Sequence, residues 1–131
     1  MRIVTWNVNG IRAAIRKGFD KFVEKIDADI WMLQEVRCLP EQLPPKWAPP
    51  KGSEMILHPA EKKGYSGVST ISRVHMKEIG RGMKGNIDPE DSEGRVLITQ
   101  HNDITLINTY LPSGSSKEER QMYKEDWMAQ W

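Results

Sequence analysis

The sequence has little cysteine, no long apolar run and almost no net charge. Cys38 is the only cysteine among the 131 residues, so no disulfide can form within the chain, and this fits a cytoplasmic, reducing location. No apolar stretch approaches the roughly 20 residues that a membrane-spanning helix needs. Asn7 and Asn9 interrupt the only apolar stretch near the N-terminus. We therefore expect no disulfide, no membrane partner and no signal peptide.

The charge balance excludes a strongly basic surface over the whole chain. The sequence has 19 Lys and Arg residues against 18 Asp and Glu residues, a formal net charge of +1. A nucleic-acid-binding role would therefore depend on a local basic face. The apolar fraction of 38%, with ten glycines besides, is typical of an ordered globular domain rather than a disordered chain.

Two other common site patterns are weak. His58, His75 and His101 each lack a second ligand at metal-binding spacing, so we expect isolated surface or strand histidines. Residues 80–85 match the dinucleotide-binding pattern G-x-G-x-x-G literally, but the segment that follows, residues 86–89, cannot open a long helix. This glycine-rich segment is therefore interpreted as a flexible loop.

The first third of the chain predicts a strand–helix–strand unit. Residues 2–8 and 29–35 are rich in β-branched and aromatic side chains, which is typical of strands. Between them, residues 11–26 place apolar side chains at helical spacing, and Gly18 is expected to break this helix into two pieces. Two strands joined by a helix predict a right-handed crossover and a parallel pair.

The rest of the chain predicts strands, one hairpin and a last helix. The five prolines between Leu39 and Pro50 predict an extended loop, and Asn102-Asp103 predicts a hairpin turn. Residues 116–119 fit a capping box in which Ser116 starts a helix, and aromatic side chains then recur at helical spacing. The class is therefore α/β with at least one mixed sheet. The later strands are expected at residues 55–57, 68–71, 95–99 and 104–110, and the aromatic stripe is Tyr123, Trp127 and Trp131.

Asn7 and Glu35 are the best candidates for a metal site from the residues alone. Each ends a strand of the predicted parallel pair, at the edge where α/β sheets place ligands. An amide oxygen and a carboxylate suit Mg²⁺, which takes one or two carboxylates and keeps several waters. The alternative is that Asn7 opens a turn and Glu35 is a solvated strand end, and composition and spacing favour this alternative.

Five short motifs, in order and at plausible spacing, favour the metal site at Asn7 and Glu35 over that alternative. Together they resemble the exonuclease III family of apurinic/apyrimidinic endonucleases, within the endonuclease/exonuclease/phosphatase superfamily, and the resemblance covers residues 1–131. The resemblance implies the N-terminal half of a four-layer α/β sandwich, with mixed β-sheets flanked by helices. The chain would then be a single incomplete domain whose C-terminal half is absent. The motifs are W-N-V-N-G-I-R (6–12), L-Q-E-V-R (33–37), G-Y-S-G-V (64–68), E-G-R-V (93–96) and N-T-Y-L-P-S-G (108–114).

The resemblance also implies an activity and roles for named residues. It implies cleavage of the phosphodiester 5′ to an abasic site in double-stranded DNA, with trimming of 3′ ends, and dependence on Mg²⁺ or, in its place, Mn²⁺. Glu35 would be the metal carboxylate, Asn7 would hold the metal or the attacking water, and Tyr110 would act at the reacting phosphate. The remaining positions implied to support the site or contact DNA are Asn9, Arg12, Arg37 and Arg95.

Two motifs of the family are missing from the sequence. No Gly-Asp-x-Asn, which positions the attacking water, and no Ser-Asp-His, whose histidine contacts the phosphate, occurs anywhere in the chain. We therefore expect the chain alone to be inactive, and we expect the inner face of its sheet and the aromatic stripe to be exposed. Three alternatives remain: half of a repair nuclease, a non-catalytic fragment that binds DNA or a complementing C-terminal half, and a superfamily phosphoesterase with another substrate.

Overall fold

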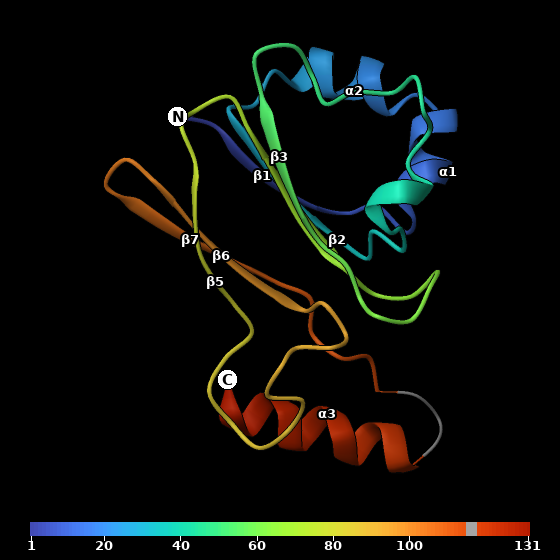
Figure 1. The fold of residues 1–131 in the computed structure, drawn as a ribbon, viewed down its shortest axis with the longest axis vertical. Coiled ribbons are helices and arrows are strands. Elements are labelled where there is room, and N and C mark those ends of the chain that lie inside the picture. The colour runs from blue at the N-terminus through green and yellow to red at the C-terminus, as the bar shows by residue number, and fades with distance from the viewer. Residues whose placement is uncertain (115–117) are drawn as a thin grey trace.

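A computed structural model describes residues 1–114 and 118–131, which form two β-sheets and three α-helices (Figure 1). None of the helices in this described part is long and apolar enough to span a membrane. The mixed α/β class with two sheets is confirmed. The elements are β1 (Ile3–Asn7), α1 (Ile11–Arg16), α2 (Phe19–Ile26), β2 (Ile30–Gln34), a 3₁₀ turn (Pro40–Gln42), β3 (Glu54–His58), β4 (Val68–Ser72), β5 (Lys77–Arg81), β6 (Val96–His101), β7 (Ile104–Thr109) and α3 (Glu118–Gln130).

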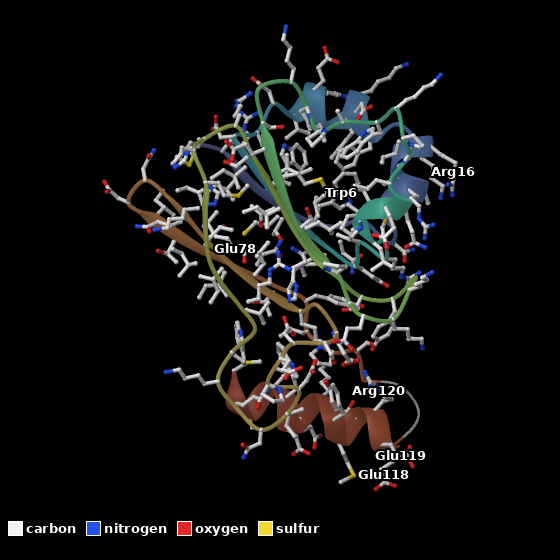
Figure 2. The ribbon with its side chains drawn as sticks, in the orientation of Figure 1. Trp6, Arg16, Glu78, Glu118, Glu119 and Arg120 are labelled. Atoms are coloured by element: carbon white, nitrogen blue, oxygen red, sulfur yellow. The ribbon has the colours of Figure 1, made fainter. Side chains whose placement is uncertain are left out.

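The first sheet has the strand order β1-β2-β4-β3, and α1 and α2 cover one of its faces (Figure 1). The predicted parallel pairing of β1 with β2 is confirmed, as is the helix break, because Gly18 has a φ of 107° between α1 and α2. Aromatic side chains fill the space between helices and sheet. Trp6 stacks on Phe19 with ring centroids 5.5 Å apart, and Figure 2 shows it on the helix-covered side of the sheet.

The second sheet has the order β5-β6-β7 and packs against the uncovered face of the first sheet. The hairpin prediction is confirmed, since Asn102 turns between β6 and β7 with a φ of 54°. The loop prediction for residues 80–85 is wrong at Gly80 and Arg81, which belong to β5. The alternation of apolar and polar side chains does not predict this strand, because its register shifts between Glu78 and Gly80.

Polar side chains, rather than aliphatic ones, fill much of the space between the two sheets. Thr99, His101 and Asn108 of the second sheet face Thr70 and Ser72 of the first, and all five are buried. Burial lowers the pKa of His101, so its ring is neutral at pH 7 and is held by Thr99 Oγ1 at 2.8 Å. Because buried polar groups need partners, these contacts fix how the sheets dock.

The end of the chain differs from one of the expectations. Trp127, with 1% of its surface exposed, is buried, so the prediction of a fully exposed aromatic stripe is wrong there, while Trp131 is 63% exposed. Gln130 of α3 exchanges two hydrogen bonds with the main chain of Ile87, at 2.7 and 3.0 Å, and so ties α3 to the glycine-rich loop. The predicted capping box depends on Ser116, which lies outside the described residues.

Candidate active site

The carboxyl ends of β1 and β2 form one continuous hydrogen-bonded edge with the loops that follow them. Asn7 pairs in register with Gln34, so Glu35 leaves the sheet beside the segment that leads into α1. The ladder continues beyond both strands and also reaches the loop before β4. Its main-chain N–H to O distances are Val8 to Gln34 3.0 Å, Gly10 to Glu35 2.8 Å, Ile11 to Val36 3.0 Å, Val36 to Gly67 3.0 Å and Arg37 to Ser66 2.8 Å.

Four non-glycine residues of this edge adopt the left-handed backbone conformation. Asn9, Glu35, Arg37 and Ser66 have φ values of 48°, 56°, 54° and 49°. Such a conformation costs a side-chain-bearing residue about 1–2 kcal/mol, and strain of this kind gathers at functional sites. The buried hydroxyl of Ser66 has no hydrogen-bond partner among the described residues. Backbone strain and an unpaired polar atom thus coincide with the positions that the motifs single out.

The predicted metal residues lie at this edge, each already engaged by a neighbour. The carboxylate of Glu35 forms a close ion pair with Arg37, whose side chain is 45% exposed. Arg12 donates from Nη2 to the main-chain oxygen of Arg37 at 3.2 Å. Asn7 accepts the main-chain N–H of Asn9 on Oδ1 at 3.0 Å. Two arginines therefore stand beside the only carboxylate of this edge.

Tyr110 follows β7 and approaches the same edge from the second sheet. Burial raises the pKa of Tyr110, and the negative charge of Glu35 raises it further, against the lowering effects of Arg95 and Arg37. The phenol is therefore protonated at pH 7 and is a hydrogen-bond donor. Glu35 and Tyr110, which are 75 residues apart in the sequence, thus lie close enough for the charge of one to act on the other.

Arg95 is buried behind Tyr110 instead of lying on the surface. Only 2% of it is exposed, and its guanidinium lies 5.1 Å from the centre of the Tyr110 ring. Its Nη1 donates to the main-chain oxygen of Tyr110 at 3.1 Å, while Tyr110 N–H donates to the main-chain oxygen of Arg95 at 2.8 Å. The structure therefore places Arg95 as a support for Tyr110 rather than as an open phosphate ligand.

Sequence reasoning missed a cluster around Glu93. Tyr65 donates to Glu93 at 2.8 Å, and Arg95 and Arg120 donate to the Tyr65 hydroxyl at 3.1 and 3.2 Å. Burial raises the pKa of Glu93, but hydrogen bonds from Tyr123 and Tyr65 outweigh it and leave the pKa lowered. Figure 2 shows Arg120 on α3, on the side that faces the rest of the molecule. Tyr65 is adjacent to Ser66 in the glycine-flanked motif, but no spacing rule links it to Glu93.

A second buried cluster anchors the start of β6. Asp91 Oδ2 lies 2.7 Å from His58 Nε2 and also accepts the main-chain N–H groups of Arg95 and Val96, at 3.0 and 2.8 Å. Arg81 Nη1 lies 3.4 Å from the other ring nitrogen of His58, which assigns the proton to Nε2. The expectation of isolated histidines is therefore wrong for His58, because its partner is 33 residues away in the sequence.

Gly94 holds Arg95 in place by a close approach that a larger residue would prevent. At Gly94, which has a φ of +59°, a Cβ atom would lie 2.6 Å from the carbonyl carbon of Pro59. Gly64 has a similar φ of +69° but nothing within 4 Å. We expect Gly64→Ala to cost about 1–2 kcal/mol of unfolding free energy through the backbone alone, and Gly94→Ala about 3–5 kcal/mol because overpacking is added. Urea denaturation of the two variants measures this difference, and equal losses would contradict the clash.

The donor set of this edge fits Mg²⁺ in kind but is incomplete. Asn7, the last residue of β1, supplies an amide oxygen, and Glu35, directly after the neighbouring β2, supplies a carboxylate. Within residues 1–114 and 118–131, no three His, Cys, Asp or Glu side chains gather as potential metal ligands. An ion at this edge would therefore have one carboxylate of this chain, with water and substrate oxygens as its other ligands.

Comparison with known proteins identifies the family. Residues 4–130 match the Endonuclease/Exonuclease/phosphatase family. The chain belongs to this family. It is 32% identical to a DNA-(apurinic or apyrimidinic site) endonuclease of Dictyostelium discoideum, over 89% of the chain and 32% of that protein. It is 31% identical to an exodeoxyribonuclease of Bacillus subtilis, over 97% of the chain and 49% of that protein.

The fold agrees with solved structures of this family. A 3′-5′ exonuclease from Neisseria meningitidis superimposes with a TM-score of 0.83 and 25% identity, covering 99% of the chain and 49% of that protein. A related Neisseria structure, described as a 3′ phosphatase, contains a product DNA hairpin. This chain thus spans a third to a half of the length of these relatives. The predicted resemblance to the exonuclease III-type endonucleases is confirmed.

Proposed function

We propose that these residues form part of a Mg²⁺-dependent DNA repair nuclease of the exonuclease III type, which hydrolyses the phosphodiester 5′ to abasic sites and trims 3′ ends. The observation that carries the proposal is the meeting of Glu35 and Tyr110 at one strained edge, with Arg12 and Arg37 beside it. The names of the relatives support DNA as the substrate class. Mn²⁺ is the alternative ion that the same oxygen ligands suit.

In this proposal each residue has a distinct task. Glu35 and Asn7 would hold Mg²⁺, which would supply neutralisation of the charge on the phosphate. Tyr110, protonated at pH 7, donates a hydrogen bond to a phosphate oxygen. Arg12 and Arg37 attract the DNA backbone, whose phosphates dominate the affinity of such complexes. Arg95 supports Tyr110 by donating to its main-chain oxygen. Asn9 donates its main-chain N–H to the side chain of Asn7 and so holds the turn after β1.

We further propose that the second half of the domain, in the same polypeptide or as a complementing chain, completes the site. The general base and the phosphate-binding histidine of the family have no counterpart in this sequence. An open groove of about 280 Å³ lies between the sheets, lined by side chains of β1, β2 and β7 and by the exposed Trp131. Apolar surface of this kind is a docking site for further strands. The main lining residues are Thr5, Met32, Gln34, Ile107, Leu111 and Trp131.

The test compares this chain with the complete product of the reading frame that contains it. Both are incubated with Mg²⁺ and a duplex that carries one abasic site. We expect a nick 5′ to the abasic site from the complete product, its loss with EDTA, and no nick from the 131-residue chain alone. Mg²⁺-dependent nicking by the short chain would overturn the need for a second half. Cleavage of RNA or of phosphorylated small molecules, but not of abasic DNA, would favour another phosphoesterase of the superfamily.

A further inference from the structure

The side chain of Asn108 joins β7 to the first sheet by hydrogen bonds. Asn108 is 1% exposed. Its Nδ2 donates to the main-chain oxygens of Leu33 at 3.2 Å and Ser69 at 2.9 Å, and contacts Thr70 Oγ1 at 3.3 Å. Its Oδ1 accepts from Gln34 Nε2 at 2.9 Å. One carboxamide of β7 is therefore satisfied by two neighbouring strands of the opposite sheet, β2 and β4.

Gln34 extends this link across the first sheet. Besides Asn108, its Nε2 contacts Thr5 Oγ1 at 2.9 Å and the main-chain oxygen of Met32 at 2.9 Å. Four strands, β1, β2, β4 and β7, are thus connected through two adjacent amide side chains. Gln34 immediately precedes Glu35, and Asn108 stands two residues before Tyr110. The link therefore lies at the base of both site residues.

The other hydrogen bonds of Tyr110 belong to its own sheet. Its main chain bonds to Arg95 at the start of β6, whereas Glu35 belongs to the edge of the first sheet. Among the described residues, Asn108 is the only side chain of β7 that hydrogen-bonds to the first sheet. The Ser72–His101 contact, at 3.3 Å, joins the sheets at the far end of β4. Within the part of the chain that the structure describes, no other side-chain hydrogen bond of β7 fixes its register against the strand that leads to Glu35.

We propose that Asn108, together with Gln34, is the positioning residue that sets the phenol of Tyr110 against the carboxylate of Glu35 across the two sheets. Two apolar side chains would fill the same space without the cost of burying polar groups. The register of β7 against β2 would then be set only by side-chain packing. Hydrogen bonds to main-chain oxygens are directional, so these can form in only one register of β7 against the first sheet. The importance of this distance for phosphate chemistry rests on the proposed function, but the geometric claim does not.

The test measures the electrostatic coupling of Glu35 to Tyr110 in the 131-residue chain. The chain has three tyrosines, and fluorotyrosine in their place gives one ¹⁹F NMR signal each, assigned by Tyr65→Phe and Tyr123→Phe. At pH 7, Glu35→Gln removes a negative charge that acts on the phenol and should therefore shift the ¹⁹F signal of Tyr110, without any titration. Arg37, Arg95 and Tyr65 also act electrostatically on this phenol. All three residues are kept both in the chain with Asn108 and in the Asn108→Leu variant.

We expect Asn108→Leu to reduce this Glu35-dependent shift of the Tyr110 signal at pH 7 to less than half, while the signals of Tyr65 and Tyr123 stay where they were. The matched control is Thr99→Val, which removes another buried polar group from the interface between the sheets, bonded to His101. We expect Thr99→Val to retain the full Glu35-dependent shift of the Tyr110 signal. An undiminished shift in Asn108→Leu, or an equal loss in Thr99→Val, would overturn the positioning role.

A second variant covers the case in which Asn108→Leu does not fold. Gln34 is half-buried, so Gln34→Met removes the same link at a smaller folding cost. We expect a partial loss of the coupling, and full coupling in this variant would overturn the proposal. Neither DNA nor metal is needed, so the outcome is independent of whether the complete product cleaves DNA.

Discussion

Glu35→Gln in the complete gene product is expected to reduce Mg²⁺-dependent nicking of abasic DNA by at least about 10²-fold. A metal ion stabilises the charge of the transition state by several kcal/mol, and each 1.36 kcal/mol corresponds to a factor of ten in rate. Glutamine keeps the size of the side chain but removes the charge that would hold the ion. Among the described residues no three potential metal ligands gather elsewhere, so we expect no other site to replace Glu35.

The measurement is the initial rate of nicking as a function of Mg²⁺ concentration. Glu54→Gln is the matched control, since Glu54 is an exposed carboxylate at the opposite end of the same sheet, paired in register with Ser72. We expect the control to stay within about twofold of the unmodified protein, as surface substitutions away from a site generally do. A Glu35→Gln rate within threefold of the unmodified rate, roughly 0.6 kcal/mol, would remove Glu35 from the metal site.

Asp91→Ala should cause a larger loss of stability than any surface substitution in the chain. Asp91 is 3% exposed, and Oδ2 alone serves the ring of His58 and two main-chain N–H groups. Alanine would leave three buried donors without an acceptor, and since each unsatisfied buried donor costs about 1–3 kcal/mol, we expect a loss of at least about 3 kcal/mol. A small domain has only about 5–15 kcal/mol in total, so this is a large share.

Asp91→Asn separates the loss of charge from the loss of the acceptor. Its amide oxygen can still receive the N–H groups of Arg95 and Val96, so we expect a loss of about 1–2 kcal/mol. Urea denaturation followed by tryptophan fluorescence measures both variants against the parent chain. Equal effects of Ala and Asn would mean that the charge matters and the hydrogen bonds do not. A loss below about 1 kcal/mol for Asp91→Ala would contradict the anchoring role altogether.

The sequence predicted the elements that local chemistry specifies. The parallel β1–β2 pair follows from two β-branched runs around an amphipathic segment, the helix break from Gly18, and the hairpin from Asn102-Asp103. β5 was missed because its register shift at Glu78/Gly80 breaks the period on which strand prediction depends. A local sequence pattern predicts an element reliably where one residue type favours one backbone conformation.

The site was predictable as a set of positions but not as a set of contacts. Glu35 and Tyr110 could be singled out from motifs, since each ends a predicted strand. The burial of Arg95, the Asp91–His58 anchor and the Asn108 link join segments that are distant in the sequence. Such contacts are set by how the two sheets dock, and no periodicity in a single segment encodes that docking.

The hydrogen-bonded ladder that continues past β1 and β2 has a consequence for binding. Glu35, Arg37 and Ser66 already form main-chain hydrogen bonds within this edge, and Asn9 donates its N–H to Asn7, before any ligand binds. The conformational entropy of ordering these loops is therefore lost once, during folding, instead of at each encounter with DNA. A preorganised edge leaves more of the interaction energy for affinity and for the transition state. The strained backbone of this edge thus holds in advance the positions that the proposed activity would use.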